Sequence, residues 1–138
     1  MVLFAEEEAV RLGASAVAPE HLLLGLLHDP SNVALRILAR LGVDVSALRS
    51  KVEGRLTARA QGADKEIRLT RESKRVIDLA YEEPKPRRLN ADWLGTEHLL
   101  LGLLRGGGQV VTEAFRLQGV SEETCRSTLE TFYKEQVV

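Results

Sequence analysis

The stretch Glu-His-Leu-Leu-Leu-Gly-Leu-Leu occurs twice in this chain, at residues 20–27 and again at residues 97–104. The two copies are identical at every position and lie 77 residues apart. When that offset is kept without gaps, residues 2–53 match residues 79–130 at 18 of 52 positions. Agreement over so long a stretch indicates that one structural unit is used twice.

Each copy of this octapeptide predicts a helix, the first over residues 19–28 and the second from about residue 96. Pro19 suits the first turn of the first helix, where its missing N–H is not needed. Because leucine fills nearly every position, both helices are expected to be buried on several faces. We expect Leu24 and Leu101 to lie where the two repeats meet.

Apolar residues at spacings of three and four predict six further helices. These cover about residues 2–12, 32–41, 44–58, 70–83, 109–118 and 121–135. Asp44 or Ser46, Thr70 and Ser121 are suitable helix caps, Gly42 suits a helix end, and Gly106-Gly107-Gly108 reads as a turn. No alternating strand pattern of useful length is present.

The predicted fold is therefore all-α, with eight helices in two pseudo-symmetric four-helix repeats. Repeat one covers about residues 2–58, a polar linker covers 59–69, and repeat two covers 70–135. A repeat of roughly 60 residues is marginal for an independent core, so we expect a single domain over residues 1–138. Prolines at 84 and 86 predict an irregular basic loop over residues 84–92.

Composition argues against several classes of partner. The formal net charge is −1 and the pI is about 6.3, so nothing draws the whole chain to nucleic acid or to an anionic membrane. No apolar run approaches the ~20 residues that span a bilayer. The single cysteine, Cys125, excludes an internal disulfide and, with an acidic N-terminal stretch unlike a secretory signal, favours a cytoplasmic protein.

The sequence predicts neither a catalytic residue, nor a metal site, nor a cofactor. His21 and His28 would lie about 10.5 Å apart along a helix, too far to share one zinc ion. The glycine run lacks the Lys and Ser/Thr of a phosphate-binding loop. Cys125 lies on an apolar helix face, where an inert thiol is expected. The octapeptide histidines are expected to be at least half-buried and to donate to backbone.

Two features keep alternatives open. Basic residues cluster between Arg55 and Arg88, either as a solvated linker and helix face or as a docking surface for an acidic partner. Glu20 and Glu97 are expected to be exposed in the first turns of their helices, where a carboxylate interacts favourably with the helix dipole. They could instead present two matched anionic sites for cationic groups.

The residues around the octapeptide resemble a known family. Each copy follows Gly/Ala and Thr/Pro and precedes a turn, an amphipathic helix and a Gly-Val pair, at 42–43 and 119–120. This pattern resembles the Clp N-terminal domain at the front of the ClpA and ClpC unfoldases, particularly that of ClpC, over roughly residues 2–133. The resemblance implies eight helices in two repeats, and docking of adaptors and substrates for an ATPase ring that feeds the ClpP peptidase.

In the ClpC branch, the resemblance also implies recognition of phosphorylated arginine. The residues that match this motif here are Thr96, Glu97 and Glu20. The first repeat departs from the family pattern, because Pro19 replaces the motif threonine and Ala18 replaces glycine. The 84–92 stretch is also longer than in the family. The chain has no Walker motif, so we expect either a stand-alone member or a piece of a longer protein.

The expected function is a non-enzymatic protein-binding module that recognises substrates or adaptors for a Clp ATPase–protease system. The alternative is an accessory structural subunit that binds the Clp protease core or the ATPase ring. A hydrolase that uses Glu97 and His98 is a third and weaker alternative.

Overall fold

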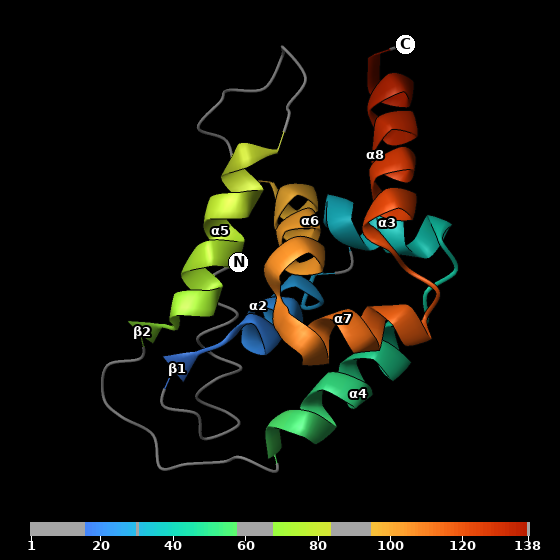
Figure 1. The fold of residues 1–138 in the computed structure, drawn as a ribbon. Coiled ribbons are helices and arrows are strands. Elements are labelled where there is room, and N and C mark those ends of the chain that lie inside the picture. Colours follow the sequence, from blue (N-terminus) through green and yellow to red (C-terminus); the bar gives the residue numbers. More distant parts are fainter. Residues whose placement is uncertain (1–15, 30, 58–67, 84–94, 138) are drawn as a thin grey trace.

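The computed structural model describes residues 16–29, 31–57, 68–83 and 95–137, which form seven helices and two short strands (Figure 1). In chain order these are β1 (Ala16–Val17), α2 (Pro19–Leu26), α3 (Val33–Arg40), α4 (Val45–Thr57), β2 (Arg68–Leu69), α5 (Arg71–Glu82), α6 (Thr96–Gly106), α7 (Gly108–Leu117) and α8 (Glu122–Val137). The expected helix over 2–12 and the loop over 84–92 lie outside the described residues, as does most of the linker.

The two octapeptide helices lie at the centre of the fold. The leucines of α2 at positions 22, 23, 24 and 26 are fully buried, and those of α6 at positions 99, 100, 101 and 103 are at most 2% exposed. The predicted burial of Leu24 and Leu101 is therefore confirmed. α6 contacts α2, α3, α5, α7 and α8, so the second octapeptide connects most of the described helices (Figure 1).

A glycine permits the close packing of α5 on α6. A Cβ atom at Gly102 would lie 2.5 Å from the carbonyl oxygen of Val76 and 3.3 Å from the backbone nitrogen of Ala80. Such distances are shorter than van der Waals contact, so the two backbones approach each other only because position 102 has no side chain.

The expected helix caps are present. Thr70 accepts from the backbone N–H of Ser73 at 3.1 Å, Asp44 accepts from that of Ala47 at 3.1 Å, and Ser121 accepts from that of Thr124 at 3.2 Å. These bonds satisfy N–H groups that a helix start leaves without intrahelical partners. The local sequence therefore sets where α4, α5 and α8 begin.

The helices that follow the octapeptides end in the same way. Gly42 after α3 and Gly119 after α7 have φ values of +76° and +74°, in the left-handed region that favours glycine. The next residue then donates back to the helix, from Val43 to Leu38 and from Val120 to Phe115, both at 3.0 Å. The predicted stop at Gly42 is confirmed.

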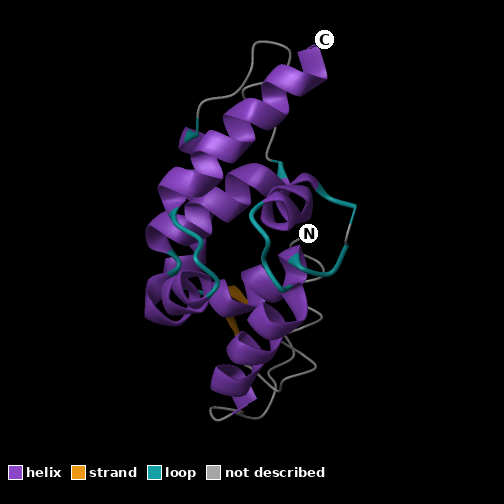
Figure 2. Ribbon diagram, turned by 90° about the vertical axis from the view of Figure 1, so that its right-hand side faces the viewer, coloured by secondary structure: helices purple, strands orange, loops and turns teal. Residues whose placement is uncertain are grey.

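Two expectations are corrected. β1 and β2 form a parallel two-residue pair, Ala16 with Arg68 and Val17 with Leu69, although no strand was expected. Figure 2 shows this pair as a small element among the helices. Pairs this short carry no alternation that a sequence could reveal. The glycine run is not a free turn, because α6 continues through Gly106 and α7 begins at Gly108, whose φ of +88° redirects the chain.

An ion-pair cluster joins α5, α6 and α8. Glu83, 4% exposed at the end of α5, accepts two hydrogen bonds from Arg126 of α8, at 2.7 and 2.9 Å. Arg105 of α6 lies 3.6 Å from the same carboxylate, and Arg126 also donates to Glu122 at 2.8 Å. The buried charge of Glu83 is thus matched by guanidinium groups.

No helix within the described ranges has the length and apolar character needed to cross a membrane.

Candidate functional site

The starts of α2 and α6 share one local geometry. The residue before each helix, Ala18 or Gly95, is extended, with φ and ψ of −88° and 168° or −87° and 164°. Its backbone N–H donates to Nδ1 of the histidine three residues on, at 2.9 Å for His21 and 3.0 Å for His98. Both histidines are buried as expected, but they accept from backbone rather than donate to it.

This bond fixes the charge of His98. Because Nδ1 accepts from Gly95, it carries no proton, and the remaining ring proton lies on Nε2. Nε2 is 3.1 Å from the hydroxyl oxygen of Tyr133, to which it donates. His98 is therefore neutral and links the start of α6 to α8.

Glu97 is a buried carboxylate, only 5% exposed, which corrects the expectation of an exposed side chain. The first turn of α6 contacts α3 through the Thr96–Ala34 hydrogen bond and α8 through the His98–Tyr133 contact. Burial raises the pKa of Glu97 above its ordinary value of 4.5, and a hydrogen bond from its own backbone N–H opposes this. Its carboxylate lies 3.7 Å from Nδ1 of His98, which is neutral, so this contact is not an ion pair.

Within the described residues, no Lys or Arg forms a salt bridge with Glu97. Glu97 therefore contrasts with Glu83, the other buried carboxylate, which is matched by guanidinium groups. A buried carboxylate without a cation is costly to the folded state. The start of α6 thus holds a charge that a bound cation would stabilise.

Thr96 joins two helix starts. Its hydroxyl oxygen accepts from the backbone N–H of Ala34 in the first turn of α3, at 3.1 Å. The N-terminal ends of α3 and α6, both partially positive, are thus brought together. Thr96 is partly exposed, and because its oxygen is the acceptor in this bond, its hydroxyl proton remains able to donate.

The three residues expected from the resemblance lie at two equivalent helix starts. Thr96 and Glu97 are neighbours in the first turn of α6, whereas Glu20 is half-buried in the first turn of α2. Pro19 is buried in front of Glu20 and offers neither a hydroxyl nor an N–H. The equivalence therefore extends to the backbone and the histidine but not to the hydroxyl.

Sequence reasoning missed two participants, Ala34 and Tyr133. Ala34 contributes a backbone N–H, which no side-chain pattern reveals, and it lies 62 residues from Thr96. Tyr133 belongs to α8, where the spacing of the apolar residues indicates only a buried face. Its position four residues after Leu129 placed it on a buried face but gave no sign of His98 as its partner.

Other candidate groups show little reactivity. Burial raises the pKa of the Cys125 thiol to about 11, which keeps it protonated at neutral pH and agrees with the expectation of an inert thiol. In the part of the chain that the structure describes, no three His, Cys, Asp or Glu side chains gather where they could hold a metal ion.

Known proteins match this chain in sequence and in fold. The family described as the Clp repeat (R) N-terminal domain matches residues 2–112. The chaperone protein ClpB of Oceanobacillus iheyensis and the negative regulator of genetic competence ClpC/MecB of Bacillus subtilis are each 36% identical over 126 residues. Each alignment covers 91% of this chain, whereas the chain spans about 15% of the length of these curated relatives.

Two solved structures share the fold. The Hsp104 N-terminal domain from Candida albicans has a TM-score of 0.72 at 20% identity, over 92% of this chain and 82% of that one. A structure from a malarial protein secretion system has a TM-score of 0.76 at 22% identity, over 97% and 90% of the two chains. At these identities the likeness is one of fold alone.

Proposed function

The chain belongs to the Clp repeat (R) N-terminal domain family, and from that premise we propose that it is a non-catalytic module that binds substrate or adaptor proteins for a Clp ATPase–protease system. We further propose that it recognises phosphorylated arginine, with Thr96 and Glu97 as the principal site and Glu20 as a weaker one. It acts in the cytoplasm, as two pseudo-symmetric repeats within one domain.

The buried carboxylate of Glu97 is the observation that carries this proposal. Glu97 is 95% removed from solvent and faces a neutral histidine, so a ligand cation would offset its burial. A guanidinium suits this position because it is planar and pairs with a carboxylate through two parallel hydrogen bonds. A lysine ammonium offers no such paired geometry.

The contact between the starts of α3 and α6 supports binding of the phosphoryl group of the ligand. Two helix starts contribute partial positive charge at the place where the Ala34 N–H reaches the Thr96 hydroxyl. The Thr96 proton can then donate to a phosphoryl oxygen. Phosphoarginine carries a phosphoryl anion next to a guanidinium cation, and the site offers a helix start for the anion and the Glu97 carboxylate for the cation. Phosphoserine carries only the anion, and arginine carries only the cation.

The first repeat supports a weaker site. Glu20 occupies the position of Glu97, and His21 repeats the backbone bond of His98. However, Pro19 lacks the hydroxyl that Thr96 provides. Binding at α2 therefore rests on the carboxylate and the helix dipole alone.

A pull-down separates this function from the accessory-subunit alternative. The immobilised chain is offered an arginine-phosphorylated peptide, its unphosphorylated form, a Clp ATPase and ClpP, each alone. Selective capture of the phosphorylated peptide is expected. If the chain captures the ATPase or ClpP and binds neither peptide, the proposal is wrong and the chain is an accessory subunit of the Clp machine.

A further inference from the structure

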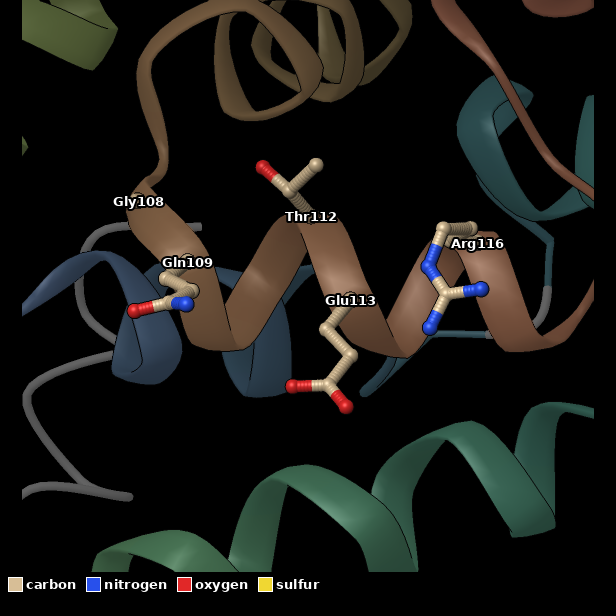
Figure 3. A pocket seen from close by; sticks show the side chains of 5 residues that line it. All are labelled: Gly108, Gln109, Thr112, Glu113 and Arg116. Atoms are coloured by element: carbon tan, nitrogen blue, oxygen red, sulfur yellow. The ribbon is translucent and has the colours of Figure 1, made fainter.

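An open pocket of about 480 Å³ lies along the exposed face of α7. It is lined by Gly108, Gln109, Thr112, Glu113 and Arg116, and Figure 3 shows the four side chains projecting from one stretch of the helix. Their spacing of three and four residues places them on one side of α7, opposite its buried residues Val111, Ala114 and Phe115. The face is thus distinct from the core side of the helix.

The charges of this pocket are unequal. Glu113 points toward α4 in Figure 3, where its carboxylate lies 3.7 Å from the guanidinium of Arg55. The side chain of Arg116 is exposed, and within the described ranges its guanidinium forms no hydrogen bond or ion pair. Glu113 is thus paired with Arg55, which leaves the Arg116 guanidinium available to an anion.

An exposed apolar residue, Leu117, follows Arg116 in the sequence. Leu117 follows Glu113 by four residues, so it continues the same side of α7, and at 54% exposure it is one of two large apolar side chains that the described surface exposes. An anion next to an apolar residue is a combination that a peptide offers. A nucleic-acid backbone would bring repeated phosphates to a place with a single free cation, in a chain whose net charge is −1.

We propose that the α7 pocket docks an acidic segment of a partner protein, with an Asp or Glu carboxylate on the Arg116 guanidinium and an apolar side chain on Leu117. This pocket is separate from the Glu97 site. It begins after the last residue of α6, whereas Glu97 lies in the first turn of that helix, about 14 Å from its end along the axis.

The test uses two acetylated peptides, Gly-Glu-Glu-Leu-Glu-Glu-Leu-Gly and its counterpart with Gln for every Glu, titrated into the isotope-labelled chain. Amide shifts within residues 108–117 are expected with the acidic peptide and not with the amide counterpart. Arg116→Glu should weaken binding by about tenfold or more, because a like charge then faces the acidic peptide. Arg116→Lys should retain most of the affinity.

Arg36→Glu is the matched control, since Arg36 is exposed on α3 at the repeat position equivalent to Glu113. It makes the same charge change away from α7 and should leave binding unaltered. The proposal is overturned if Arg36→Glu and Arg116→Glu weaken binding equally, if both peptides bind alike, or if inorganic phosphate or oligo-dT shifts the same amides as strongly as the acidic peptide. None of these outcomes bears on phosphoarginine binding at Glu97.

Discussion

The backbone N–H of Ala34 donates to the hydroxyl oxygen of Thr96 across 3.1 Å, and this bond joins the start of α3 to the start of α6. The residue that we propose for ligand binding is therefore also part of the packing between helices. The hydroxyl oxygen of Thr96 accepts a hydrogen bond from the protein, and the hydroxyl proton is available to donate to a ligand.

Replacing Thr96 measures how much its hydrogen bond with Ala34 contributes to stability. Thr96→Val keeps the shape but leaves the Ala34 N–H without its acceptor, and should lower the free energy of unfolding by about 1–2 kcal/mol. Thr96→Ser keeps the hydroxyl and should cost less. Urea denaturation measures both variants, and a Thr96→Val protein as stable as the wild type would show that the bond adds nothing.

Gly102→Ala should destabilise the fold. The added methyl group would meet the Val76 carbonyl oxygen at 2.5 Å, and overpacking of this kind costs about 1–3 kcal/mol. The matched change Gly54→Ala, within α4, meets no atom within 4 Å and should stabilise by up to about 1 kcal/mol. Thermal melts that move in the same direction for both variants would refute the close contact of α5 with α6.

The ion-pair cluster around Glu83 should contribute more to the free energy of unfolding than an exposed ion pair does. Glu83→Ala leaves Arg126 without its main partner, and we expect a loss of about 1–3 kcal/mol, less than for a fully buried pair because water still reaches Arg126. Glu135→Ala removes the exposed partner of Arg40 and should change stability by less than about 1 kcal/mol. Equal losses in denaturant titrations would contradict this difference.

Glu97→Gln should raise stability at neutral pH. Because burial raises the folded-state pKa of Glu97, the protonated form is favoured in the folded protein, and the ionised form carries a penalty. That penalty is absent below the ordinary value of 4.5 and grows as the pH rises through the raised pKa. The melting temperature of Glu97→Gln should therefore exceed that of the wild type at pH 7 and approach it at pH 4. A gain independent of pH would exclude this cause.

Most helix boundaries could be predicted from the residues close to them in the sequence. The caps at Asp44, Thr70 and Ser121, and the stop at Gly42, are written in neighbouring residues, so they could be predicted from the sequence. The continuation of α6 through Gly106 could not, because glycine runs ordinarily favour a turn and packing against α5 overrides that preference.

For the candidate site, too, the sequence indicated local residues but not the contacts between distant segments. The family resemblance of the doubled octapeptide and its flanks indicated Thr96, Glu97 and Glu20 as site residues, which stays a prediction. The burial of Glu97 was not predicted, because it arises from tertiary packing. Contacts between residues far apart in sequence, such as that of Tyr133 with His98, leave no periodic signal. The polar stripe on α7 was visible in the sequence as spacing, yet spacing alone does not distinguish a pocket from an ordinary solvated face.

The central claim is that the buried carboxylate of Glu97 is retained for a ligand cation. Calorimetric titration of phosphoarginine into the wild type, Glu97→Gln and Glu20→Gln tests it most directly. We expect binding to the wild type, a loss of at least ~1.5 kcal/mol in Glu97→Gln, the scale of a charged hydrogen bond, and a smaller loss in Glu20→Gln. Equal affinity in the wild type and Glu97→Gln, or no binding by the wild type, would contradict it.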